Sequence, residues 1–363
     1  ALANGASENT FYGYYAGNEV TTGGGNTFIG GVSAQSVTTG DDNTAVGQDT
    51  LRGITTGSNN TAIGKDALRV SSADNNTSVG CQALKANTTG TSNVAVGAYS
   101  LDANTTATNN TAIGRSALGS TTTGGDNSAV GSEALFTNTT GTSSNAFGFQ
   151  ALKSNTTGTQ NQAFGREAMW SNTTGGWNVG IGNGALWSNV SGNYNTGVGR
   201  SALFANTGSN NTSLGYHAGN SITTGSNNIC IGYDTDASAV DVSNEITLGN
   251  SSITKFRIPG LNFSIKDSTA TDNYVLTVDA NGDAGWEAAS GGGASTGETY
   301  VRLKAANGSA NDTGSNTISG YQAGSDISDG IDNTFYGQRA GKATTTGDYN
   351  VAVGSDSIRY ATT

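Results

Sequence analysis

A five-residue sequence, Asn60-Thr61-Ala62-Ile63-Gly64, recurs in close copies along almost the whole chain and constrains the fold more than any other feature. Successive copies of its glycine are seventeen residues apart, with two intervals of sixteen. Fifteen of these anchor glycines follow without a break: Gly13, Gly30, Gly47, Gly64, Gly80, Gly97, Gly114, Gly131, Gly148, Gly165, Gly182, Gly199, Gly215, Gly232 and Gly249. Three more resume the spacing after a gap: Gly320, Gly337 and Gly354. A fixed short period is typical of a solenoid, in which each repeat is one coil that buries apolar surface by stacking on its neighbours.

Within one coil, positions are numbered from the anchor glycine as zero. The residues from −4 to −1 are polar, Thr-like, small and then Ile, Val, Leu or Phe, and this alternation predicts a short strand. The Ala-Leu pair at +3 and +4 predicts a second short strand or a bend with one apolar side chain inside. The Thr-Thr-Gly sequence at +8 to +10 predicts a turn in which glycine supplies a positive φ. Helices are excluded, because the apolar spacing is not helical and glycine recurs too often.

Variant coils indicate that positions +4 and +7 fill the same interior space. Most coils carry Leu at +4 and a polar residue at +7. Where +4 is glycine, an apolar residue appears at +7: Gly17 with Val20, Gly219 with Ile222 and Gly324 with Ile327. The coil containing Gly341 breaks the rule, since its +7 residue is Thr344.

Each coil offers only about two large apolar side chains, which is little against the entropy of ordering seventeen residues. The small residues at −2 and the large residues at −1 cannot both point into one narrow coil. We therefore expect one of these two faces to pack against another chain. A parallel homotrimer would bury that face around an axis and close the assembly.

Four segments are expected along the chain. Residues 1–250 form a β-roll of about fifteen coils, and residues 251–289 form a connector of strands. In the connector, Ile253–Ile258 and Tyr274–Asp279 are predicted strands, and Asn281-Gly282 predicts a hairpin turn. Residues 290–298 are a Gly/Ser-rich joint, and residues 299–363 begin a second, truncated roll. The predicted fold class is thus an all-β parallel β-roll, or solenoid, with a short hairpin connector between two rolls.

Composition narrows the classes of function. Fifty-five glycines, one proline and 12% charged residues do not fit an ordinary globular domain. A net charge of −11 without any basic cluster argues against nucleic acid as a partner. No run of eighteen apolar residues exists, so we expect no membrane insertion in this segment. The absence of an initial Met leads us to expect a piece of a longer protein. Cys81 and Cys230 lie nine coils apart, about 40 Å, too far for an intrachain disulfide.

The sequence offers no recognisable catalytic, cofactor or metal site. The one histidine, His217, is expected in an exposed loop, which leaves Ser-His and Cys-His catalysis without support. Asp234, Asp236 and Asp241 match no calcium loop and are interpreted as a polar end-cap. Several asparagines lie in Asn-x-Ser/Thr sequons, and a ladder of stacked side chains is the favoured interpretation over glycosylation: Asn87, Asn104, Asn138, Asn155 and Asn172.

One group of residues suggests a role in binding as well as a structural one. Aromatic side chains occupy +5 in three successive coils and +12 in two of them, and they are a candidate contact with the sugars of a host polysaccharide: Trp170, Trp187 and Phe204 at +5, and Trp177 and Tyr194 at +12. The plainer interpretation is that these rings stack between coils or touch a neighbouring chain.

The Asn-Thr-Ala-Ile-Gly repeats resemble the heads of trimeric autotransporter adhesins, which form a trimeric parallel β-roll. The longer coil with Ala-Leu and Asn-Thr-Thr-Gly, followed by Asn244–Gly260 and Tyr274–Trp286, resembles tail fibres of bacteriophages, cyanobacterial phages above all. This resemblance implies a non-enzymatic, homotrimeric fibre on a virion that displays host-attachment regions. Two alternatives stay open: a bacterial cell-surface adhesin or extracellular filament subunit, and, least favoured, a polysaccharide-degrading spike.

Overall fold

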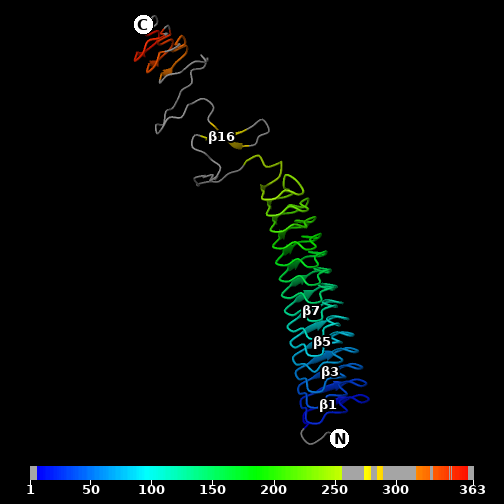
Figure 1. Cartoon of the computed structure of the whole chain (residues 1–363). Coiled ribbons are helices and arrows are strands. Elements are labelled where there is room, and N and C mark those ends of the chain that lie inside the picture. The colour runs from blue at the N-terminus through cyan, green and yellow to red at the C-terminus, as the bar shows by residue number, and fades with distance from the viewer. Residues whose placement is uncertain are drawn as a thin grey trace. The chain divides into compact units, whose positions relative to one another are not determined.

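The computed structural model describes residues 6–255, 274–278, 284–288, 316–327, 330–342, 344 and 346–358. The chain divides into two units, Ala1–Pro259 and Gly260–Thr363, each of which is described by itself. Among the described residues there are strands and turns but no helix. In the first unit the coils stack one on the next from the blue N-terminal end onward (Figure 1).

The first unit is a parallel sheet of fifteen three-residue strands, one from each coil. Each strand pairs with the strand one repeat later, so that Thr44 lies beside Thr61 and Val46 beside Ile63. The strands are β1 (Thr10–Tyr12), β2 (Thr27–Ile29), β3 (Thr44–Val46), β4 (Thr61–Ile63), β5 (Thr77–Val79), β6 (Val94–Val96), β7 (Thr111–Ile113), β8 (Ser128–Val130), β9 (Asn145–Phe147), β10 (Gln162–Phe164), β11 (Val179–Ile181), β12 (Thr196–Val198), β13 (Thr212–Leu214), β14 (Ile229–Ile231) and β15 (Ile246–Leu248). The predicted solenoid is confirmed: the repeat is one coil, and its strand lies before the anchor glycine.

The remainder of each coil is made of turns, which decides one local prediction and corrects another. The Ala-Leu segment at +3 and +4, predicted as a strand or a bend, is a turn with its leucine buried. Leu118 has φ 52°, and its N–H donates to the Ala134 carbonyl of the next coil. The glycine of the Thr-Thr-Gly turn does not supply a positive φ. Gly57 is needed instead because a Cβ there would lie 2.6 Å from the Ala73 carbonyl oxygen of the next coil.

The interior of the roll is filled by the small residue at −2 and the leucine at +4. In the coil anchored at Gly64, Ala62 and Leu68 are both fully buried. Therefore the small face of the strand points inward and the large residues at −1 point outward, a choice that the alternation alone left open.

The shared space at +4 and +7 is confirmed, and the structure adds a third contributor. Val20 and Ile222 are buried at +7, where the +4 residue is glycine. In the coil that breaks this rule, the buried Phe335 at −2 fills the volume, since a Cβ on Gly341 would lie 2.5 Å from its ring. Position −2 thus shares one cavity with +4 and +7, because the strand lies directly opposite the turn.

Two ladders of buried asparagine side chains run along the interior. In the +7 ladder, Asn155 Nδ2 donates to Asn138 Oδ1 at 2.9 Å and to the Gly158 carbonyl at 3.0 Å. The predicted structural ladder at the sequons is therefore confirmed. A second ladder at −4 was not predicted: Asn60 donates its backbone N–H to Asn43 Oδ1 and its Nδ2 to the Ala73 carbonyl. These side chains satisfy backbone groups that would otherwise be buried without partners.

The second unit contains an antiparallel hairpin of β16 (Tyr274–Val278) and β17 (Ala284–Ala288), with Leu276 opposite Trp286. It also contains a parallel sheet of β18 (Thr317–Ser319), β19 (Thr334–Tyr336) and β20 (Val351–Val353), each one repeat apart. The hairpin and the second roll were both predicted. The predicted strand Ile253–Ile258 is wrong over Ile253–Lys255, where the backbone is not paired, and its remainder lies outside the described residues, as does the predicted joint at 290–298.

Candidate interaction surfaces

The first candidate interaction surface is the outer face of the sheet in the first unit, where the side chains at −1 point outward. Ile63 and Ile113 are 40% and 41% exposed, although they are large and apolar. We call this column the outer ridge; its fifteen members are Tyr12, Ile29, Val46, Ile63, Val79, Val96, Ile113, Val130, Phe147, Phe164, Ile181, Val198, Leu214, Ile231 and Leu248. This unbroken apolar column makes the outer ridge the first candidate interaction surface of the unit.

The columns beside the outer ridge are more polar. The −3 position, on the same strand face, is mostly threonine, such as Thr61 and Thr111. The +1 position carries aromatic and cationic residues, and the Arg200 guanidinium lies 5.6 Å from the centre of the Tyr216 ring. An apolar centre with a mixed polar rim is the usual composition of a protein–protein interface.

The predicted aromatic residues form two stacks, one in each column. Trp170 and Trp187 are 5.1 Å apart between ring centres and parallel to within 4°, and Phe204 continues the stack at 5.4 Å. Trp177 and Tyr194 form the second stack at 5.3 Å. The structure thus brings together the members of each column.

This geometry determines which parts of the rings a ligand could reach. Each ring covers a face of the next one along the +5 stack, so the inner faces of Trp170 and Trp187 are occupied by protein. The +12 pair is the more accessible, with Trp177 48% and Tyr194 56% exposed. A sugar approaching from the side therefore meets ring edges in both stacks, whereas sugar stacking uses ring faces.

Titratable groups do not assemble into a reactive site in the part of the chain that the structure describes. His217 is half-buried rather than fully exposed as predicted, stacks on Tyr216, and places Nδ1 3.8 Å from Asp234 Oδ1. Asp236 accepts a hydrogen bond from the Ser221 backbone N–H, as an end-cap would. Burial raises the pKa of the Cys230 thiol to about 11, so this cysteine is no nucleophile.

Within the described ranges, no three His, Cys, Asp or Glu side chains lie close enough together to hold a metal ion. None of the described segments forms a helix that is long and apolar enough to cross a membrane.

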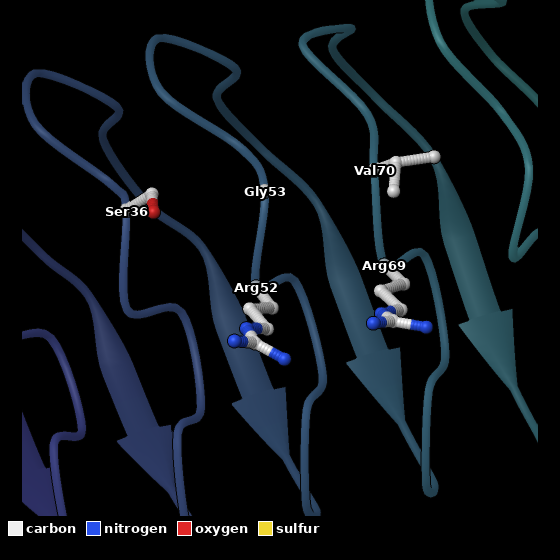
Figure 2. A pocket seen from close by; sticks show the side chains of 5 residues that line it. All are labelled: Ser36, Arg52, Gly53, Arg69 and Val70. Carbon is white, nitrogen blue, oxygen red and sulfur yellow. The ribbon is translucent and has the colours of Figure 1, made fainter.

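A shallow hollow lies between neighbouring coils near the N-terminal end, lined by Ser36, Arg52, Gly53, Arg69 and Val70 (Figure 2). The two arginines extend in the same direction from adjacent coils. Each is paired within its own coil, Arg52 with Asp49 at 3.1 Å and Arg69 with Asp66 at 3.6 Å. Because these carboxylates compensate the two cationic charges, the hollow has no excess charge to attract an anion.

The fold and its surfaces define the class as a parallel β-solenoid built from repeats of about seventeen residues. Comparison of the chain with protein-family models, curated proteins and solved structures finds no match.

Proposed function

We propose that the chain is the shaft of a structural fibre made of three parallel copies, part of a phage tail or another virion appendage that holds host-attachment regions away from the particle. The single observation that carries the proposal is the outer ridge, which the coil itself leaves uncovered. In this proposal the protein works outside the cell and performs no catalysis.

The size of the outer face fits association with a second and third copy. Fifteen strands at ~4.8 Å spacing give a length of ~70 Å, and three residues of strand give a width of ~10 Å. The resulting ~700 Å² per chain is close to the ~800 Å² that each partner contributes to a standard interface. A copy of the same chain has the same repeat along its axis, so its ridge matches this one over the full length.

The outward orientation of the large residues also favours three copies around a common axis over two copies packed face to face. The ridge is one residue wide on each strand and is flanked by threonines at −3. Three narrow ridges can meet at a common axis with their −3 columns at the rim of the contact, and a closed ring leaves no ridge free for further growth.

The biological owner is proposed from the resemblance of the repeats. The Ala-Leu and Asn-Thr-Thr-Gly elements followed by a hairpin favour a phage fibre, while the shorter Asn-Thr-Ala-Ile-Gly element is shared with trimeric adhesins of bacteria. A bacterial surface adhesin or filament subunit is therefore the alternative owner of the same shaft. A polysaccharide-degrading spike is least favoured, because no described carboxylate pair stands out as a general acid and nucleophile.

The decisive test of the outer ridge is a charge placed on it. Substituting Ile63, Ile113 and Ile181 with Lys should prevent self-association, because three buried ammonium groups would meet at each level of the axis. The matched control places Lys at exposed +9 positions of the shaft, Thr56, Thr106 and Thr174, and should leave the assembly unchanged. Light scattering coupled to size exclusion would report the mass of both; an unchanged mass in the ridge variant would reject the proposed interface.

A host polysaccharide is the proposed receptor class for the two aromatic stacks. Trp170→Ser with Trp187→Ser removes the +5 stack, and Trp177→Ser with Tyr194→Ser removes the more exposed +12 stack. Binding of each intact assembly to an array of bacterial surface polysaccharides would be compared with that of the unsubstituted chain. Loss of binding would support a role for the substituted column, and full binding by both variants would leave the stacks with a structural role only.

A further inference from the structure

The Asn-x-Ser/Thr sequons of the described chain fall into two classes that the sequence alone does not separate. Eight have a buried asparagine: Asn87, Asn104, Asn138, Asn155, Asn172 and Asn189 at +7, and Asn76 and Asn211 at −4. Four have an exposed asparagine five residues before the next anchor glycine, which is +12 in a seventeen-residue coil and +11 in a sixteen-residue coil: Asn59, Asn75, Asn109 and Asn210. Asn250 is half-exposed at the end of the roll.

In seven of the eight buried sequons the amide nitrogen donates both of its hydrogens to protein acceptors, and Asn138, the exception, donates one to the Gly141 carbonyl. Asn172 Nδ2 donates one hydrogen to Asn155 Oδ1 at 2.8 Å and the other to the Gly175 carbonyl at 3.0 Å. Asn104 Nδ2 likewise donates to Asn87 Oδ1 at 2.8 Å and to the Ala107 carbonyl. N-glycosylation replaces one amide hydrogen, so each of these seven asparagines would lose a hydrogen bond on modification.

The sugar would also have to lie in the core. Asn138 and its neighbours in the +7 column are fully buried beside the leucines at +4. Interiors are close-packed and admit no ring of that size without opening the coil. A modified coil could not close against the next one, and stacking is the source of stability in a solenoid.

The exposed class presents the opposite geometry. Asn59, Asn75, Asn109 and Asn210 lie at φ 60–61° on the turn before the next strand, with side chains at the surface. A glycan on these residues would extend into solvent and leave both ladders intact.

We infer that N-glycosylation of the buried sequons blocks folding of this chain, so that the roll forms only in a cell or compartment without that modification. The reaction joins the amide nitrogen to the anomeric carbon of an oligosaccharide carried on a lipid diphosphate. The bond from that carbon to the diphosphate oxygen breaks, one amide proton is lost, and the lipid diphosphate leaves. Since the transfer takes place on the unfolded chain, burial in the folded state gives the asparagines no protection. This inference does not depend on the proposed function.

The third residue of each sequon allows a test that leaves both asparagine ladders in place. In the sequons whose asparagine is at +7, the third residue lies at the exposed +9 position. The test variant therefore carries Ala at six such positions: Thr89, Thr106, Thr140, Thr157, Thr174 and Ser191. In the sequons whose asparagine is at −4, the third residue lies at −2, where seven of the fifteen coils of the first roll already have alanine, so Ser78→Ala and Ser213→Ala complete the set. The matched control carries Ala at exposed +9 positions that belong to no sequon, Thr22, Thr39, Thr56, Thr123 and Thr224.

The full chain, the test variant and the control would each be secreted from eukaryotic cells and also made in a bacterial cytoplasm. From bacteria all three should give the same β-rich circular dichroism spectrum. From the secretory pathway, the unsubstituted chain and the control should be glycosylated at +7 and retained or aggregated. The test variant should be secreted folded, with glycans located by mass spectrometry at Asn59, Asn75, Asn109 or Asn210.

Two results would overturn the inference. One is a folded, secreted unsubstituted chain, whether or not its +7 asparagines carry glycans. The other is failure of the secreted test variant although its bacterial counterpart folds, since glycans at the buried sequons would then not be the cause.

Discussion

The shared cavity of positions −2, +4 and +7 leads to a prediction about paired substitutions. In the coil anchored at Gly148, Ala146 occupies −2 and Leu152 occupies +4, and both are fully buried. Leu152→Gly removes four carbons from the core and should cost ~2–5 kcal/mol. Ala146→Phe alone adds a ring to a filled interior and should cost ~1–3 kcal/mol through overpacking.

Together the two substitutions reproduce the arrangement of the coils in which phenylalanine at −2 faces glycine at +4. In those coils a Cβ on Gly17 would lie 2.8 Å from the Phe11 ring, and a Cβ on Gly341 would likewise clash with the Phe335 ring. Glycine also relieves the left-handed backbone at Leu152, φ 51°, where a side chain costs ~1–2 kcal/mol. The double variant should therefore be at least ~2 kcal/mol more stable than the sum of the single effects predicts.

Local stability is the proper readout, because long repeat arrays need not unfold in one step. Hydrogen exchange of the amides in this coil, measured for the four proteins of the cycle at one concentration, gives the coupling free energy. Effects that add within ~0.5 kcal/mol would mean that the two positions do not share a cavity, and the account of the core would be refuted.

Three further predictions concern single positions. Gly97→Ala should abolish folding of the surrounding coils, because φ is 135° there and the new Cβ would lie 2.6 Å from the carbonyl oxygen of the next anchor, Gly114. Circular dichroism of the purified variant would show the loss of β structure, and a native spectrum would contradict the prediction. At pH 8 a thiol reagent should modify the exposed Cys81 quickly and Cys230 only after unfolding, since burial raises the Cys230 pKa to about 11; two fast equivalents would be inconsistent with that burial. Hydrogen bonds from Lys153 and Gln150 lower the pKa of Glu133, so this carboxylate stabilises the fold above its ordinary pKa of 4.5, and the contribution disappears as the pH falls through the lowered value. Lys153→Met should return the Glu133 pKa, followed by NMR, toward its ordinary value and cost at most ~1 kcal/mol at pH 7; an unshifted titration would count against this ion pair.

Much of the fold was predictable because one local pattern is repeated fifteen times. The interval between anchors predicts stacking, and the alternation from −4 to −1 predicts a strand, without reference to distant contacts. The same alternation says only that Ala62 and Ile63 point to opposite sides. Deciding which side is inside requires the width of the coil, because the interior holds a small side chain such as Ala62 together with the leucine at +4 of the same coil, Leu68.

The turns were harder to predict because tertiary packing overrides residue preference. Leucine rarely adopts a left-handed backbone, yet Leu118 does so because burial of its side chain and its hydrogen bond to the next coil outweigh the local cost. The glycine at +10 suggested a special φ, but its role is close approach between coils, which a single coil does not reveal. The −4 asparagine ladder could have been recognised from its regular recurrence, since an asparagine repeated in register can bond along the axis.

The candidate surfaces were also predictable only in part. The sequence singled out the aromatic columns, because Trp170 and Trp187 recur at one position of the repeat. It did not indicate that their faces would cover each other, which depends on the rotamers that one-coil spacing permits. The outer ridge became identifiable only when the structure showed the −1 residues outside.

The central claim is that the roll is one of three parallel copies, and the mass of the folded particle tests it most directly. Sedimentation equilibrium of the purified chain of 36.4 kDa should give three times that mass, about 109 kDa, together with a β-rich spectrum. A stable, folded particle of 36.4 kDa would show that the outer ridge needs no partner, and the account of the fibre would fail.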